Sequence, residues 1–215
     1  PKLTSEQSEI HQALIESVGS NITLKYPKNG EYRSAYVIAN IDDEPADEAM
    51  VFYEYTSNGS EEDGLRVNIL DKDEDGKWYS VKELAGAGTD IDQVIISPMG
   101  SNNQTDVFVG YQNLTNDEKT MEIYSYTDGD FKRVALDTYS VLEPLDINND
   151  GYIELITIQR STNNDTGAVT AKASMLNMKN DEITRGENVD MCDNVTSYVS
   201  SKTGMLDSGR RAIFI

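Results

Sequence analysis

Cysteine is almost absent from this sequence, because Cys192 is the only one in 215 residues. One cysteine cannot form an intrachain disulfide, whereas a eukaryotic extracellular domain of this size usually carries several. Histidine is equally scarce, with His11 alone, so we expect neither a histidine-based zinc site nor a Cys–His catalytic pair. These absences favour a bacterial origin.

Basic residues are also few, with 18 Lys and Arg against 38 Asp and Glu and a net charge of −20. Binding to a phosphate backbone needs clustered Lys and Arg, so we expect no nucleic-acid partner. An anionic membrane surface would repel the chain. No apolar run is long enough for a transmembrane segment. Cations are the natural partners of so acidic a protein surface. We also favour a monomer.

Hydrophobic residues make up 38% of the chain and fall in short runs rich in Val, Ile, Tyr and Phe. This pattern is typical of a folded, β-rich chain with polar loops and not of a disordered one. The length allows one large domain or two small ones.

Four similar segments recur along the chain, each a polar residue followed by an apolar run. Their equivalent residues 49, 107, 155 and 212 are 58, 48 and 57 residues apart. A strand-forming segment precedes each, near residue 198 in the fourth unit, and two more follow in the first three units. The fourth strand of the third unit is expected at 183–189. Four short strands per unit of about 50 residues predict the blades of a β-propeller. A β-sandwich is the alternative that the same strands allow. The second strands are expected at 48–54, 106–111, 154–159 and 211–215.

The sequence before the repeats predicts a helix at 4–18 and a strand at 22–26. Thr4 and Gln7 form a capping box, and Gly19 can end the helix. The apolar face of the helix comprises Ile10, Ala13, Leu14 and Val18.

We therefore expect an all-β, propeller-like array of four-stranded antiparallel blades with a short N-terminal helix. The helix and strand extension would occupy residues 1–33, and the repeats would form one domain at 34–215. About three and a half blades cannot close a ring. We thus expect truncation at the C-terminal end, and the strand at 22–26 is a candidate to join the last blade. The blades are predicted at 34–86, 90–137, 140–190 and, in part, 195–215.

One loop carries oxygen-bearing side chains at alternate positions. Asp146, Asn148 and Asp150 occupy positions 1, 3 and 5. Gly151 allows a sharp turn, and Glu154 follows at position 9. Hard oxygen donors without sulfur or imidazole favour Ca²⁺ over a transition metal. An EF-hand would need Glu at position 12, where this chain has a threonine inside the next strand. The alternative is an Asx-rich turn without a metal.

This loop resembles the calcium loop of FG-GAP and VCBS β-propeller repeats, which occur in integrin α-subunits and in many bacterial surface proteins. In that family an Asp-x-Asp-x-Asp-Gly loop with an acid at position 9 joins the first two strands of a blade. The resemblance implies one Ca²⁺ site. Its ligands would be side-chain oxygens of Asp146, Asn148, Asp150 and Glu154 and the backbone carbonyl of Tyr152.

The first unit offers a weaker second candidate, with Asn40, Asp42, Glu44 and Glu48 at the equivalent positions. Pro45 stands where the other loop has its glycine, and proline cannot take a positive φ. We expect this loop to bind a metal weakly or not at all. The segment 71–76 also opens like a calcium loop, but no acid closes it, so we expect a solvated turn.

No nucleophile elbow, phosphate loop or histidine-based zinc motif is present. We therefore expect a non-catalytic bacterial extracytoplasmic domain, as in surface lipoproteins and secreted proteins. It would bind a glycan or protein ligand through its blade loops. The alternative is a polysaccharide-active enzyme whose catalytic residues lie on the propeller top face or in missing blades. A purely structural domain is a third interpretation.

Overall fold

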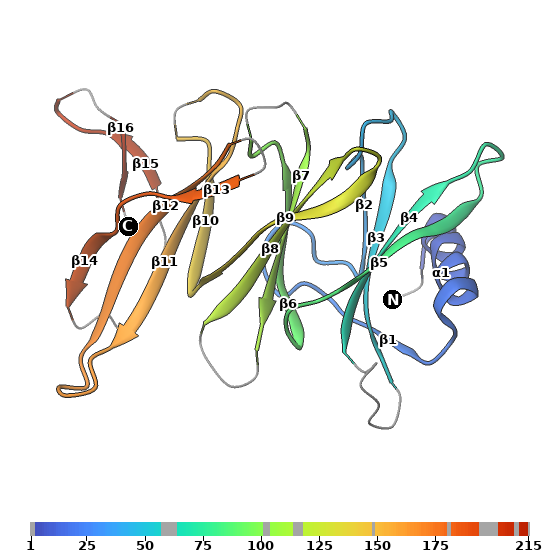
Figure 1. Ribbon diagram of the computed structural model, residues 1–215, viewed down its shortest axis with the longest axis horizontal. Coiled ribbons are helices and arrows are strands. Elements are labelled where there is room, and N and C mark those ends of the chain that lie inside the picture. Colours follow the sequence, from blue (N-terminus) through green and yellow to red (C-terminus); the bar gives the residue numbers. More distant parts are fainter. Residues whose placement is uncertain are drawn as a thin grey trace.

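The computed structural model describes residues 3–56, 64–100, 104–113, 118–147, 149–179, 182–193, 202–208 and 211–214. Within these ranges the chain forms one helix and a series of antiparallel sheets (Figure 1). The elements are α1 (Ser5–Val18), β1 (Ile22–Leu24), β2 (Tyr36–Ala39), β3 (Glu48–Tyr55), β4 (Leu65–Lys72), β5 (Trp78–Ala85), β6 (Asp90–Ser97), β7 (Asp106–Gln112), β8 (Lys119–Thr127), β9 (Asp130–Tyr139), β10 (Val141–Leu145), β11 (Glu154–Thr162), β12 (Val169–Lys179), β13 (Glu182–Arg185), β14 (Val189–Asp193), β15 (Lys202–Met205) and β16 (Arg211–Phe214).

Helix α1 begins and ends where the sequence predicts. The Thr4 side chain accepts a hydrogen bond from the Gln7 backbone N–H, and the Gln7 side chain accepts one from the Thr4 N–H, both at 3.1 Å. Gly19 follows the last turn with a φ of +84°. The buried face of α1 packs against the first sheet through Ile10, Ala13 and Leu14.

The first sheet has the order β1-β3-β4-β5, with β2 beside β3 as well. Strand β2 pairs with residues 48–51 of β3, and β1 pairs with residues 53–55 of the same strand. The expectation that the strand near residue 22 joins the last blade is therefore wrong. β3 is longer than β2, and β1 pairs with the part that β2 leaves open.

The second sheet, β6-β7-β8-β9, has the predicted four strands, and the third sheet follows the order β10-β11-β12-β13. The fourth strand expected at 183–189 is instead two strands, because β13 and β14 pair with different parts of the long β12. In the fourth unit β15 pairs with β16. The strand expected near residue 198 lies outside the described residues.

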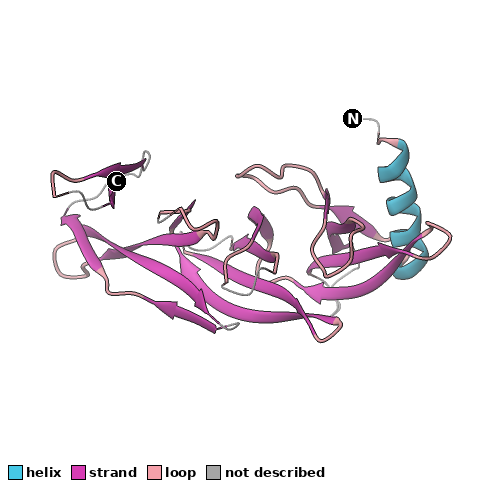
Figure 2. Cartoon of the chain, turned by 90° about the horizontal axis from the view of Figure 1, so that it is seen from above, coloured by secondary structure: helices cyan, strands magenta, loops and turns pink. Residues whose placement is uncertain are grey.

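The sheets follow one another in a shallow open arc, with α1 at one end and the β15–β16 hairpin at the other (Figure 2). Apolar cores fill the spaces between them. In β3, Met50 and Phe52 face a core shared with the second sheet, whereas Val51 and Tyr53 face the core under α1. Strand β7 divides its side chains in the same way between its two neighbouring sheets. Strands β3 and β7 are thus buried on both faces, as predicted for second strands.

Polar contacts also join neighbouring sheets. The Lys82 ammonium on β5 donates to Asp130 Oδ1 and to the Phe131 carbonyl oxygen, both at 2.6 Å. Arg185 on β13 donates to Asp137 Oδ2 on β9 at 2.5 Å. These contacts join the first sheet to the second and the second sheet to the third.

A buried carboxylate ties the N-terminal extension to the second sheet. Asp92 on β6 is only 1% exposed. Its Oδ1 accepts from Lys119 Nζ and from Asn29 Nδ2, both at 2.8 Å, and its Oδ2 accepts from the Tyr139 hydroxyl at 2.7 Å. A buried charge is tolerated only with such partners, so each of them stabilises the folded state.

The chain is therefore an all-β, propeller-like array of four-stranded antiparallel blades with a short N-terminal helix. The division into one repeat domain at 34–215 and an extension at 1–33 stays a prediction. Among the described residues, no helix has the length and apolar character to cross a membrane.

Candidate functional site

Three connections of equal length, described except at residues 101–103 and 148, lie in a row along one edge of the array, the upper edge in Figure 1. Each joins the first and second strands of a blade. The strand pairs end at Ala39 with Glu48, at Ser97 with Asp106 and at Leu145 with Glu154. Eight residues lie between the partners in each case, at 40–47, 98–105 and 146–153.

The acid that begins each second strand closes its own loop. Each accepts a hydrogen bond from the backbone N–H of the residue seven positions earlier. The pairs are Ile41 with Glu48 at 2.8 Å, Met99 with Asp106 at 2.9 Å and Ile147 with Glu154 at 3.0 Å. Sequence comparison of the units aligned these acids only as possible metal ligands. Their common structural role is to fasten the loop to the sheet.

In the third blade the predicted ligands also organise the loop. Asp146 accepts from the N–H of Asp150 at 3.1 Å and from that of Gly151 at 3.0 Å. Asp150 accepts from the Tyr152 N–H at 2.9 Å. Asn149 and Gly151 have φ of +60° and +91°, which glycine and asparagine adopt most readily. Asn148 lies outside the described residues.

The electrostatics of this loop favour a cation. Burial raises the pKa of Glu154, and the nearby negative charges of Asp150 and Asp146 raise it further. A carboxylate oxygen that accepts one N–H keeps capacity for a second contact. The donor set therefore fits Ca²⁺ in its chemistry. Within the described ranges, however, no three His, Cys, Asp or Glu side chains are grouped closely enough to hold a metal. Binding an ion would require these carboxylates to turn toward one another.

The first loop has the same length but a reversed hydrogen bond. Pro45 stands at the position of Gly151 and has no N–H to donate. Asn40, at the position of Asp146, donates through its amide nitrogen to the carbonyl oxygens of Glu44 and Ala46. The first position thus acts as a donor in this loop. Weak or no metal binding at Asn40, Asp42, Glu44 and Glu48 stays a prediction.

Glu48 is nevertheless an unusual group, because it is a carboxyl only 1% exposed. Its Oε2 accepts from Ile41, whereas its Oε1 is buried without a hydrogen-bond partner among the described residues. Burial raises the pKa of Glu48 to about 7, and the charges of Asp42 and Asp71 add to the effect. This carboxyl is therefore held partly protonated near neutral pH.

In their described residues, the second and fourth loops lack the features of a metal site. In the second loop Pro98 occupies the first position, and Asp106 is already engaged by the N–H groups of Met99 and Gly100 and by the Ser125 hydroxyl. The fourth loop, at 206–210, has five residues between paired strand ends instead of eight.

The segment 71–76 is the turn expected from its lack of a closing acid. Asp73 accepts from the N–H groups of Asp75 at 3.0 Å and Lys77 at 2.8 Å, and Gly76 has a φ of +76°. The turn is exposed from Asp73 to Lys77.

No protein-family model matches the chain, and a search of curated proteins finds no match. The likeness to FG-GAP and VCBS repeats therefore rests on the loop residues of this sequence.

The raised pKa of Glu48 makes a prediction for the pH dependence of stability. The folded protein holds the proton of the Glu48 carboxyl more tightly than the unfolded chain does, because unfolded glutamates ionise at about pH 4.3. Stability from this group is thus present at low pH and is lost as pH rises toward about 7. We expect this group to lower the free energy of unfolding of wild type by about 2 kcal/mol between about pH 5 and pH 8. Glu48→Gln cannot ionise, so it should not show this decrease.

Urea unfolding at a series of pH values measures this effect as the difference between the two proteins. Glu187→Gln, at an exposed position on another blade, is the matched control. Parallel pH profiles for wild type and Glu48→Gln would show that Glu48 titrates normally.

Proposed function

We propose that this protein is a non-catalytic extracytoplasmic domain that binds a glycan or protein ligand through its blade loops. The observation that carries the proposal is the row of three eight-residue loops on one edge of the array (Figure 1). Paired sheets and buried polar contacts form a rigid support, and loops on such a support are the usual place for a binding surface.

Calcium at the third loop would stiffen this surface. Asp146, Asn148, Asp150 and Glu154 would supply side-chain oxygens, and Tyr152 a backbone carbonyl. The ion would neutralise carboxylates whose mutual repulsion already contributes to the raised pKa of Glu154. The hydrogen bonds from Asp150, Gly151 and Tyr152 support this assignment, because they draw the loop around the carboxylate of Asp146 and fix that of Asp150.

We also propose that the chain acts outside the cytoplasm, at the surface of a bacterial cell or secreted, with a lipid anchor as one form of attachment. The scarcity of cysteine and the excess of acid support this, and Ca²⁺ is plentiful in that compartment.

Affinity electrophoresis in gels that contain a soluble polysaccharide tests the binding function. We expect at least one of a panel of dextran, xylan, pectin and β-glucan to slow the protein. Asp43→Ala, in the exposed part of the first loop, should reduce the retardation. Asp165→Ala, in the exposed β11–β12 loop at the opposite edge, should leave it unchanged.

The same polymers separate binding from catalysis. Release of reducing ends in proportion to protein concentration would favour the polysaccharide-active enzyme. Migration unchanged by every polymer would contradict the glycan part of the proposal.

A further inference from the structure

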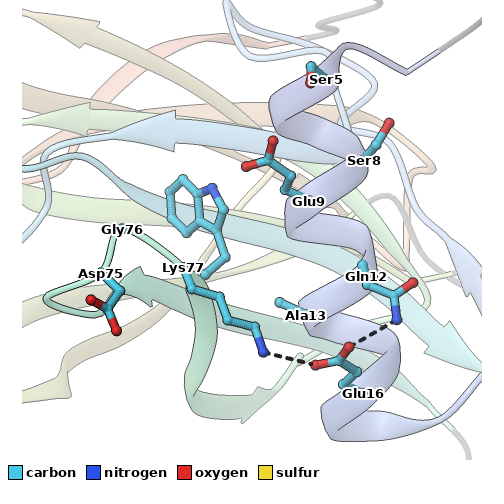
Figure 3. A pocket seen from close by; sticks show the side chains of 10 residues that line it. Ser5, Ser8, Glu9, Gln12, Ala13, Glu16, Asp75, Gly76 and Lys77 are labelled. Atoms are coloured by element: carbon cyan, nitrogen blue, oxygen red, sulfur yellow. Dashed lines mark hydrogen bonds and ion pairs between the residues drawn. The ribbon is translucent and has the colours of Figure 1, made fainter.

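A groove of about 530 Å³ lies between α1 and the β4–β5 hairpin, at the α1 end of the array (Figures 1 and 3). Its helical wall has residues spaced by three or four positions, which places them on one face of α1. The hairpin turn and the start of β5 form the other wall. The polar residues of the helical wall are Ser5, Ser8, Glu9, Gln12 and Glu16, and the hairpin contributes Asp75, Gly76, Lys77 and Trp78.

The groove is acidic. Glu9, Glu16 and Asp75 line it against a single cation, Lys77. Lys77 Nζ lies 3.8 Å from Glu16 Oε2, and both side chains are more than half exposed, so this pair is weak. The Glu9 carboxylate makes no ion pair or hydrogen bond within the described part of the chain. Glu16 Oε1 also accepts from Gln12 Nε2 at 3.0 Å, in an exposed contact along the helix (Figure 3). A cationic ligand would therefore meet the unpaired Glu9 carboxylate and a Glu16 carboxylate held only by exposed contacts.

Trp78 gives the groove a second, independent feature. The residue lines the groove, yet it is only 2% exposed. Its indole Nε1 is buried without a hydrogen-bond partner in the described residues. An indole N–H can only donate, and buried donors are nearly always satisfied in folded proteins. Lys72 Nζ lies 4.4 Å from the centre of the ring and supplies no acceptor. Among the described residues this donor therefore has no acceptor, and the three carboxylates of the groove outnumber its one lysine.

We propose that this groove binds an extended peptide segment that carries two Lys or Arg side chains. A peptide offers both missing groups, because its backbone carbonyls accept hydrogen bonds and its basic side chains pair with carboxylates. A second copy of this chain is a poor occupant, since its net charge of −20 would be repelled. The proposal does not depend on calcium or on the loops at 40–47, 98–105 and 146–153.

The spacing of the acids defines the peptide. Glu9 and Glu16 are seven residues apart on α1, which corresponds to about 10.5 Å along the helix axis. In a polyproline II segment, residues three apart lie on the same side at about 9.3 Å. Basic residues at positions i and i+3 therefore match the two carboxylates. Partial displacement of a neighbouring side chain would bring a peptide carbonyl to the indole N–H.

The test uses the fluorescence of Trp78, which is the only tryptophan in the chain. The probe is the blocked peptide Gly-Lys-Pro-Pro-Lys-Gly, and the control peptide has glutamine in place of both lysines. We expect a saturable change in Trp78 emission with the lysine peptide and none with the glutamine peptide. Salt should weaken the binding, because exposed ion pairs are screened.

Two double variants with the same change in net charge distinguish binding in this groove from a general electrostatic attraction to the acidic protein. Glu9→Gln with Glu16→Gln should weaken binding about tenfold, as expected for two lost ion pairs. Glu182→Gln with Glu187→Gln, exposed on the third blade, should change it less than about twofold. Both pairs are on the surface, and their melting temperatures should stay close to that of wild type.

Three results would overturn the proposal. One is the absence of a saturable change with millimolar lysine peptide. Another is an equal loss in the two double variants, which would indicate non-specific attraction to an acidic protein. The third is equally tight binding of the glutamine peptide or of a neutral oligosaccharide, which would assign the groove to another ligand.

Discussion

Replacing Gly110 by alanine is expected to destabilise the protein by about 3 kcal/mol or more. A Cβ at this position of β7 would lie 2.0 Å from the hydroxyl oxygen of Tyr139 and 3.2 Å from the ring of Phe108. Tyr139 and Phe108 are fully buried, so neither can move into solvent. Overpacking of this kind costs about 1–3 kcal/mol. Displacing the Tyr139 hydroxyl from Asp92 adds about 1–3 kcal/mol, because a buried carboxylate loses a donor.

For a chain of this length the change corresponds to a melting temperature lower by about 10 °C. Thermal and urea unfolding measure it directly. The double variant Gly110→Ala with Tyr139→Phe is the informative control, because it removes the clashing oxygen and leaves the ring at 3.2 Å from the new methyl group. We expect the double variant to be more stable than Gly110→Ala alone. If it is less stable, the cost of the alanine does not arise from the hydroxyl.

Local chemistry was enough to predict the helix and most strands. The capping box of Thr4 and Gln7 and the terminal Gly19 bound α1 within one residue of the predicted range. The apolar runs beginning at Glu48, Asp106 and Glu154 mark the buried second strands. These signals depend only on residues that are close in the sequence, so the sequence alone is enough to recognise them.

The errors arose where a long-range choice decides the structure. Strand β1 alternates in hydrophobicity in the same way wherever it pairs, so only the unequal lengths of β2 and β3 assign it to the first sheet. The division of the last strand of the third blade into β13 and β14 likewise depends on the length of β12. Neither length is encoded by a local motif.

In the loops, too, the residue types could be compared from the sequence, whereas the hydrogen bonds that they make could not. Alignment of Asn40 with Asp146 suggested similar oxygen ligands in two blades. The structure differs because Pro45 offers no N–H and because Asn40, unlike an aspartate, carries a donor, so Asn40 donates where Asp146 accepts. Both differences together reverse the hydrogen bonding of the loop, which a comparison of oxygen ligands alone does not reveal.

Calcium at the third loop is expected to raise the free energy of unfolding by about 2.7 kcal/mol at a free concentration one hundred times Kd. The ion would bind only the folded loop, where Asp146, Asp150 and Glu154 each accept a backbone N–H and would turn toward one another to hold it. EGTA should therefore lower the melting temperature by about 5–10 °C relative to saturating Ca²⁺. Mg²⁺ should restore much less of it, because it demands a tighter octahedron.

Two substitutions assign this response to the loop. Asp146→Ala also removes the acceptor for Asp150 and Gly151, so it lowers stability even in EGTA. The relevant quantity is therefore the shift between EGTA and Ca²⁺, which Asp146→Ala should largely abolish. Asp71→Ala should preserve the full shift, because the turn at 71–76 is closed by Asp73 and not by an ion. If wild type melts at the same temperature in EGTA and in millimolar Ca²⁺, the third loop is an Asx-rich turn. Its acids would then serve only to accept the backbone N–H groups that shape it.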